Sequence, residues 1–273
     1  MEVIVSASIV LYNSDDVVCK AIASLLKAKI GLKLFLVDNS PTRALETKLA
    51  AFINNPQVEY IYNNANVGFG AAHNIAIKKS IPFAKYHLVI NPDIYFEEGV
   101  VEALYAYMEI NKEVGHVMPK ILYPDNTVQY VAKLIPSPID LLARRFLPSF
   151  VFKKRNKTLQ LECSGYNQVF EAPYLSGCFM FLRMAALNEV GLFDERFFMY
   201  PEDIDLTRRI HKKFKTVFYP AVYVYHEHGK GSYKSMKMLW IHTVNIIKYF
   251  NKWGWFNDTE KRSINKATLG QFN

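Results

Sequence analysis

Short apolar runs alternate with stretches of helical spacing along the first part of the chain. Residues 3–12, 32–37, 58–62 and 88–90 are rich in apolar and β-branched side chains, as buried strands are. Between and after these runs, apolar residues recur every three or four positions and predict helices. One of these helices is capped by Ser40-Pro41, and another spans 97–112. This alternation predicts an α/β fold, Rossmann-like, with a doubly wound and mostly parallel sheet.

The pattern changes after about residue 115. Residues 117–122, 169–174 and 179–182 have the composition of strands, but long irregular stretches separate them. The segment 236–256 again has apolar residues at helical spacing and predicts an amphipathic helix that docks on the core. We therefore expect two halves, 1–115 and 116–232, which share one sheet with a mixed second half, and a helical extension at 233–273.

Composition argues against several classes of protein. The chain has 273 residues, 51% of them hydrophobic, which allows a sizeable core and argues against disorder. No apolar run approaches the ~20 residues of a membrane-spanning helix, and Glu2 is unlike the start of a signal peptide. We therefore expect a cytoplasmic protein. The three cysteines show no Cys-x-x-Cys spacing, so neither a disulfide framework nor structural zinc is expected.

The net charge of +8 favours an acidic partner. Nucleic acid, an anionic membrane and a phosphorylated substrate all meet that requirement. The sequence has no zinc-finger, homeodomain or RNA-recognition pattern, which disfavours nucleic acid.

Two of the expected strands end in candidate ligand sites. Pro92 cannot continue a central strand, so Asp93 lies just past a carboxyl end, where open α/β sheets bind ligands. Beside the amide oxygen of Asn91, Asp93 offers hard oxygen ligands to a divalent cation that holds a phosphate. Asp38, after the second strand, could bind a base or a ribose hydroxyl. The alternatives are an ordinary Asn-Pro-Asp turn and a helix cap.

A loop with two glycines precedes the third expected helix. Gly68 and Gly70 permit unusual backbone angles and a close approach, and a helix N-terminus favours an anion. The loop is neither a Walker A motif nor the dinucleotide fingerprint, so its sequence alone is a weak signal. His73 and Asn74 follow and could face a ligand, although a packing or surface role is expected for His73.

Acidic residues open a later helix. Pro201 suits the first helical position, which places Glu202 and Asp203 in the first turn. Acids are common there because the helix dipole favours them. The aromatic run at 197–200 argues for more than that role, since a partly desolvated carboxylate has a raised pKa and suits a general base.

Histidines follow the last expected strand. His226 and His228 are two positions apart, and at most one of them is expected to reach the site. A histidine at a strand end, followed by glycines and a serine, is a better ligand candidate than an isolated one. Lys230 and Ser232 could meet phosphate oxygens.

Taken in order, these motifs resemble glycosyltransferase family 2, which has the GT-A fold. The resemblance runs from Ser8 to about Ser232 and rests on residues 37–40, 66–74, 91–93, 176–180, 197–206 and 226–229. It implies inverting transfer from a nucleotide-diphospho-sugar by a catalytic domain at 1–232, with the donor bound by 1–115 and the acceptor by 116–232. Within the family, the chain most resembles rhamnosyltransferase-like enzymes of bacterial surface polysaccharide synthesis, so dTDP-rhamnose is the expected donor.

The resemblance also implies roles for single residues. Asp203 would deprotonate the acceptor hydroxyl, supported by Glu202 and Asp205. Asp93 would hold Mg²⁺ or Mn²⁺ on the diphosphate, together with His226 or, as a second choice, His228. Donor contacts are expected at Tyr12, Asn13, Asp38 (to the nucleobase), Asn39, Asn66, Gly68, Gly70, Asn74, Asn91, Gly177, Lys230 and Ser232. Family members often have Asp where Asn91 stands, and an amide binds a cation less well, which leaves metal dependence open.

Other interpretations remain. The segment 135–156 mixes apolar and basic residues and could lie on an anionic membrane to reach a lipid-linked glycan acceptor, or it could be a basic loop over the acceptor site. A sugar-nucleotide transferase would carry a Gly-rich basic loop near the N-terminus, which residues 8–13 lack. A non-catalytic nucleotide-sugar binder would need no base, and a dehydrogenase would need the missing Gly fingerprint.

Overall fold

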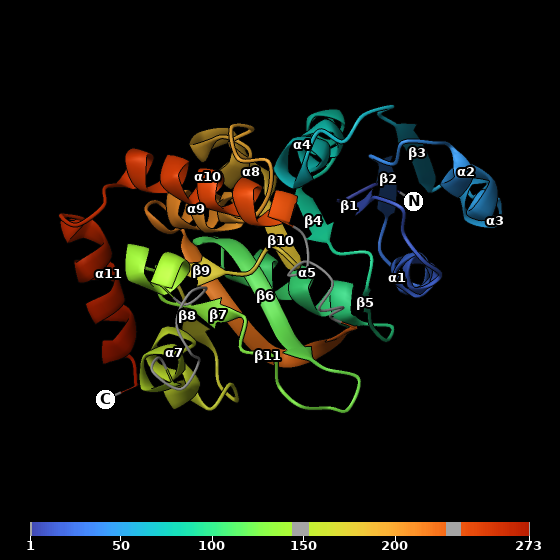
Figure 1. The fold of residues 1–273 in the computed structure, drawn as a ribbon. Coiled ribbons are helices and arrows are strands. Elements are labelled where there is room, and N and C mark those ends of the chain that lie inside the picture. Colours follow the sequence, from blue (N-terminus) through green and yellow to red (C-terminus); the bar gives the residue numbers. More distant parts are fainter. Residues whose placement is uncertain (1, 144–152, 228–235, 273) are drawn as a thin grey trace.

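The computed structural model describes residues 2–143, 153–227 and 236–272 (Figure 1). Four parallel strands lie in the spatial order β3-β2-β1-β4, with bounds β1 Val5–Leu11, β2 Leu32–Asp38, β3 Val58–Tyr62 and β4 Tyr86–Ile90. The connecting helices are α1 Val17–Leu26, α2 Ala44–Lys48, α3 Ala50–Ile53 and α4 Phe69–Ser80. β1, β2 and β4 are buried along nearly their whole length, which explains their continuous apolar sequences. The predicted α/β fold with a mostly parallel sheet is confirmed.

Strands from the second half extend this sheet. β10 (Phe179–Arg183) runs antiparallel between β4 and β6 (Val114–Leu122), and β11 (Lys215–His226) lies parallel to β6. The short strands β5 (Ile94–Tyr95) and β8 (Phe170–Glu171) pair with β11, while β7 (Ala132–Lys133) and β9 (Tyr174–Leu175) form a separate ribbon. The remaining helical segments are α5 Val100–Ile110, η1 Ile139–Ala143, α7 Lys153–Leu159, η3 Glu162–Ser164, α8 Met184–Val190, α9 Pro201–His211, α10 Met236–Trp253 and α11 Thr259–Gly270. None of the helices in the described ranges is long and apolar enough to cross a membrane.

Two predicted elements differ in the structure for identifiable reasons. Ser40 does not cap a helix, because its hydroxyl oxygen accepts a hydrogen bond from the backbone N–H of Asn13 at 2.9 Å, and α2 begins only at Ala44. The single strand expected at 169–174 is divided into β8 and β9. Pro173 lies at the interruption, where it cannot donate to a strand ladder.

The C-terminal helices pack on α9. Figure 1 shows α10 lying along α9, and Phe197, Ile204, Ile246, Tyr249 and Phe250 form a buried cluster there. The predicted helix at 236–256 is therefore present and docks on the core.

An ion pair joins α9 to the start of α11. The Arg208 guanidinium, 1% exposed, donates two hydrogen bonds of 2.7 Å to the carboxylate of Asp258 and lies 4.0 Å from the Trp253 ring centroid. Asp258 is also the N-cap of α11, through a hydrogen bond from Lys261 N–H. A buried guanidinium needs such a partner, because an unpaired charge inside a protein is strongly destabilising.

We expect Asp258→Asn to lower the free energy of unfolding by about 3–5 kcal/mol, since it removes the charge opposite Arg208 while keeping a residue that can cap α11. Glu260→Gln is the matched control. Glu260 also contacts Arg208, at 2.9 Å, but its side chain is 41% exposed, so a loss below about 1 kcal/mol is expected. Urea unfolding followed by circular dichroism measures both, and equal losses would contradict the assignment.

Candidate active site

A cavity of about 360 Å³ lies between the carboxyl edge of the sheet and the first turn of α9. Five predicted site residues line it: Asn91, Gly177, Glu202, Asp203 and His226. They come from the end of β4, the start of β10, the start of α9 and the end of β11. Much of the remaining wall is aromatic or apolar, and includes Phe69, Tyr174, Met199, Tyr200, Ile204 and Ile246. The fold thus gathers distant motifs around one space.

Asp203 is held in place by three hydrogen bonds. The backbone N–H of Gly177 donates to Oδ2 at 2.9 Å, the Tyr174 hydroxyl donates to the same oxygen at 3.2 Å, and the N–H of Ile204 donates to Oδ1 at 2.8 Å. A side chain at residue 177 would obstruct this contact, because a Cβ there would lie 2.9 Å from Asp203 Cβ. Burial raises the pKa of Asp203, and the two backbone hydrogen bonds oppose that rise.

Glu202 is buried beside Asp203, but its carboxyl group receives fewer hydrogen bonds. Burial and the charge of Asp203 raise the pKa of Glu202 well above its ordinary value. Among the described residues, none forms a hydrogen bond with Glu202 Oε2. Two adjacent buried carboxyl groups do not readily ionise together. Because Asp203 receives the hydrogen bonds, its pKa is raised less than that of Glu202, and Asp203 is the first of the two to ionise.

The turn before α9 is strained. Tyr200 has φ +92° and ψ −78°, a γ-turn conformation that costs a non-glycine residue about 1–3 kcal/mol. Its ring meets His242 of α10 edge to face, with centroids 4.5 Å apart. Pro201 follows at the start of the helix, as predicted. The turn thereby directs the first-turn carboxyl groups toward the cavity.

Asp93 and His226 meet through a short strand pairing. His226 is paired with Ile94 across β11 and β5, and the N–H of Glu227 donates to Asp93 O at 2.9 Å. As a result, Asp93 Oδ1 lies 3.2 Å from His226 Nε2. Asp93 does not itself line the cavity wall, but His226 and Asn91 do.

The residues expected at the nucleobase lie along the same edge. Asp38 is buried and accepts hydrogen bonds from the N–H of Ser40 at 2.8 Å and from the Tyr60 hydroxyl at 2.5 Å. Asn13 lines a hollow of about 250 Å³ near the start of α2. Tyr12 is 54% exposed, so its ring is accessible at this end of the sheet.

Other expected donor contacts are engaged within the protein. Asn39 donates to Gly68 O at 3.2 Å and to Asn66 Oδ1 at 3.4 Å. Asn66 Oδ1 also accepts from the N–H of Gly68 at 3.1 Å. These bonds tie the end of β2 to the loop before α4.

The two glycines of that loop approach protein. Gly68 has φ +92°, and a Cβ there would lie 2.4 Å from Phe198 O; at Gly70 a Cβ would lie 2.9 Å from Phe193 Cβ. The amide of Asn74 bonds both backbone groups of Phe193, at 2.9 and 3.0 Å. Gly68, Gly70 and Asn74 thus pack the start of α4 against the segment that leads into α9.

Asp205 does not line the described cavity. It is fully buried and pairs with Arg209 at 2.9 Å and with Lys252 at 2.6 Å. The supporting role that the resemblance implies for Asp205 stays a prediction. His228, Lys230 and Ser232 lie outside the described residues.

Tyr174 and Gln129 contact the site but carried no signal in the sequence. Tyr174 reaches Asp203 because β9 contacts α9. Gln129 follows the turn after β6 and hydrogen-bonds His226. Neither belongs to a motif, and both depend on pairings between distant segments.

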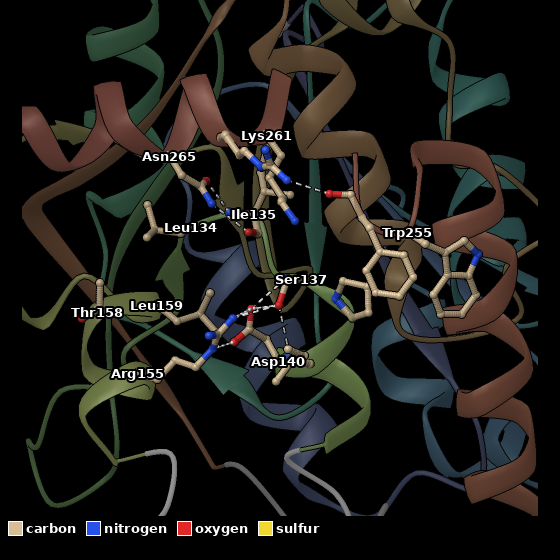
Figure 2. Close-up of a pocket in the computed structure, with 14 residues that line it drawn as sticks. Leu134, Ile135, Ser137, Asp140, Arg155, Thr158, Leu159, Trp255, Lys261 and Asn265 are labelled. Carbon is tan, nitrogen blue, oxygen red and sulfur yellow. Dashed lines mark hydrogen bonds and ion pairs between the residues drawn. The ribbon is translucent and has the colours of Figure 1, made fainter. Parts of the chain in front are cut away.

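A larger cavity of about 500 Å³ lies where residues 134–140 and α7 meet the turn between α10 and α11 (Figure 2). Its buried acid, Asp140, is paired with Arg155 and accepts hydrogen bonds from Ser137. None of the predicted site residues that the structure describes lines it. The smaller cavity, with its unequal carboxyl pair, is therefore the candidate active site.

Comparison with known proteins gives the family. The sequence model described as Glycosyl transferase family 2 matches residues 6–191, a range that ends before α9. The chain is 30% identical over 241 residues to the N-acetylglucosaminyl-diphospho-decaprenol L-rhamnosyltransferase of Mycobacterium tuberculosis, covering 81% of this chain and 76% of that protein. It is 26% identical over 252 residues to Rhamnosyltransferase WbbL of Escherichia coli, covering 88% and 90%.

Solved structures share the fold at low sequence identity. GalNAc-T7, solved with UDP, GalNAc and Mn²⁺, has a TM-score of 0.63 and 17% identity, over 82% of this chain and 43% of that chain. S. aureus TarS has a TM-score of 0.61 and 14% identity, over 98% and 42%. This chain therefore spans less than half of either protein. The sequence matches and the GT-A fold agree: the chain belongs to glycosyl transferase family 2 and is similar to rhamnosyltransferases.

Proposed function

We propose that this glycosyltransferase moves a sugar, with inversion, from a nucleotide-diphospho-sugar to a hydroxyl group of a glycan acceptor. One observation carries the proposal: Asp203 and His226 line the same cavity, and Asp93 lies 3.2 Å from His226. A group that accepts a proton and a pair that suits a cation thus lie around one space. Transfer from a diphosphate donor is assisted by a base at the acceptor hydroxyl and by a cation at the departing diphosphate.

Asp203 acts as the general base. Its carboxylate takes the proton of the acceptor hydroxyl while the acceptor oxygen bonds the anomeric carbon. The bond from that carbon to the diphosphate oxygen breaks, and attack from the opposite face inverts the anomeric centre. Gly177 and Tyr174 hold the carboxylate for this step, and a positioned base contributes about 10²–10⁴-fold.

Asp93 and His226 would hold Mg²⁺ or Mn²⁺. Asp93 Oδ1 is buried, lies 3.2 Å from His226 Nε2 and accepts no hydrogen bond from the described residues, as suits a cation ligand. No group of three or more His, Cys, Asp or Glu side chains among the described residues could hold a metal, so donor phosphate oxygens and water would complete the coordination. When bound, the cation stabilises the charge that grows on the leaving diphosphate.

The donor and acceptor are proposed from the relatives. Both relatives described above are named rhamnosyltransferases, and one name specifies an N-acetylglucosaminyl-diphospho-decaprenol substrate. We propose dTDP-rhamnose as the donor and a lipid-linked glycan of surface polysaccharide synthesis as the acceptor. Residues 1–115 would bind the nucleotide, with Tyr12, Asn13 and Asp38 at the base, and residues 116–232 would bind the acceptor. The reaction would take place in the cytoplasm.

Asp203→Asn is expected to lower kcat by at least about 10²-fold, because the amide cannot take the acceptor proton. The affinity of this variant for the donor should stay within a few-fold of that of the unmodified protein. Glu202→Gln is the matched variant: since the pKa of Glu202 is raised well above its ordinary value, the neutral amide is a close substitute and should retain most of the activity. Initial rates of nucleoside diphosphate release and calorimetric binding of the nucleoside diphosphate separate the two effects. Equal losses in both variants would contradict the assignment of the base.

The donor assignment is tested with dTDP-, UDP- and GDP-sugars, each with Mg²⁺ or Mn²⁺ and a diphospholipid-linked N-acetylglucosamine acceptor. We expect acceptor-dependent release of dTDP from dTDP-rhamnose. A sugar-nucleotide transferase would instead release pyrophosphate from a nucleoside triphosphate and a sugar phosphate. A non-catalytic binder would be stabilised by a donor in thermal unfolding and would release nothing.

Peripheral contact with an anionic membrane is proposed for the segment 135–156. Residues 144–152 lie outside the described residues; of the remainder, Ile139 is 51% exposed, and Lys153 and Lys154 are exposed. Flotation with vesicles of neutral lipid, or with added anionic lipid, measures the contact. We expect binding only to the anionic vesicles, reduced by high salt because the attraction is screened. Equal flotation with both would contradict the proposal.

A further inference from the structure

Gln129 hydrogen-bonds His226 through both the nitrogen and the oxygen of its side-chain amide. Its Nε2 donates to the backbone carbonyl of His226 at 2.9 Å, and its Oε1 lies 2.9 Å from Nδ1 of the His226 ring. Both residues are buried, with 6% and 5% of their surfaces exposed. The backbone N–H of Gln129 donates to Ile121 O of β6 at 2.9 Å, so the backbone of Gln129 is anchored to the sheet. The position of its side-chain amide relative to His226 is therefore well defined.

These two hydrogen bonds determine which ring nitrogen of His226 carries a hydrogen. A backbone carbonyl can only accept a hydrogen bond, so the amide nitrogen of Gln129 must be the end that faces His226 O. The amide oxygen then faces Nδ1, and since that oxygen can only accept, Nδ1 must carry a hydrogen. In a neutral imidazole ring the lone pair is consequently on Nε2.

Nε2 is the atom that faces Asp93. It lies 3.2 Å from Asp93 Oδ1, so the two atoms are close enough for one cation to bind both. A metal-binding histidine typically has its other ring nitrogen bonded to a carbonyl or carboxylate oxygen that sets its tautomer and orientation.

We propose that Gln129 is a positioning residue for metal binding: it holds His226 in the form with hydrogen on Nδ1 and directs Nε2 toward the cation shared with Asp93. The inference rests on the metal site of the proposed function. It adds a residue that lies outside every motif of the sequence and does not line the candidate active site.

Gln129→Met tests the role, because methionine is similar in length but has no amide to hold the ring. The measured quantity is the dissociation constant of Mn²⁺, from electron paramagnetic resonance titration with saturating dTDP or UDP. We expect binding about 10–100-fold weaker than in the unmodified protein. Gln129→Glu keeps an oxygen for Nδ1 and loses the donor to the carbonyl, so it should bind Mn²⁺ more tightly than Gln129→Met.

Asn265→Leu is the matched control. Asn265 also uses both ends of its side-chain amide, which bond the backbone N–H and carbonyl of Ile135 at 3.0 and 2.9 Å, and it does not line the candidate active site. This variant should lose thermal stability without losing Mn²⁺ affinity. Equal Mn²⁺ affinity in Gln129→Met and the unmodified protein, or an equal loss in Asn265→Leu, would overturn the positioning role. If the unmodified protein binds no Mn²⁺ with either nucleotide, the metal site of the proposed function fails first and the inference with it.

Discussion

The site depends on the direction of one strand. β10 runs antiparallel between two strands that are parallel to each other, with Phe179 opposite Ile90. Its beginning therefore lies at the edge where β4 ends, and the N–H of Asn91 bonds Cys178 O at 2.9 Å across that junction. If β10 were parallel, its end would lie at this edge and Gly177 at the opposite one. The antiparallel insertion places the backbone N–H of Gly177 beside Asp203 and joins the two halves in one sheet.

Some buried charged groups form ion pairs and others accept hydrogen bonds mainly from neutral groups, and this difference separates structural groups from those in the candidate active site. Arg208 has two carboxylate oxygens and an aromatic face, so its charge has a structural role. Asp203 accepts hydrogen bonds from two backbone N–H groups and the Tyr174 hydroxyl, and the charge of Lys133 opposes the rise of its pKa. Among the described residues, Glu202 Oε2 accepts no hydrogen bond. Burial raises the pKa of both carboxyl groups, as the proposed base requires.

Much of the fold could be predicted because strand burial and helix boundaries leave local signals. The alternation in the first half, Pro201 at the start of α9 and Asp93 beyond a buried strand all follow from short stretches of sequence. The pairing of β5 with β11 could not be predicted, since two residues of strand carry no pattern. For the same reason the contacts of Gln129 and Tyr174 were missed. Gly68 shows another limit: a sequence indicates a close approach of the backbone but does not say whether the neighbour is a ligand or Phe198.

The contact between Arg208 and Asp258 has a consequence for how this chain can be recombined. The segment after residue 232 follows the predicted catalytic domain in sequence, yet its Asp258 supplies the anion for a guanidinium on the helix that carries Asp203. A chimera that takes its last forty or so residues from another relative would thus inherit an uncompensated cation within two turns of Asp203, unless the donor sequence brings an acid to the same place. Exchange of acceptor specificity by grafting should therefore move α9, α10 and the start of α11 as one block.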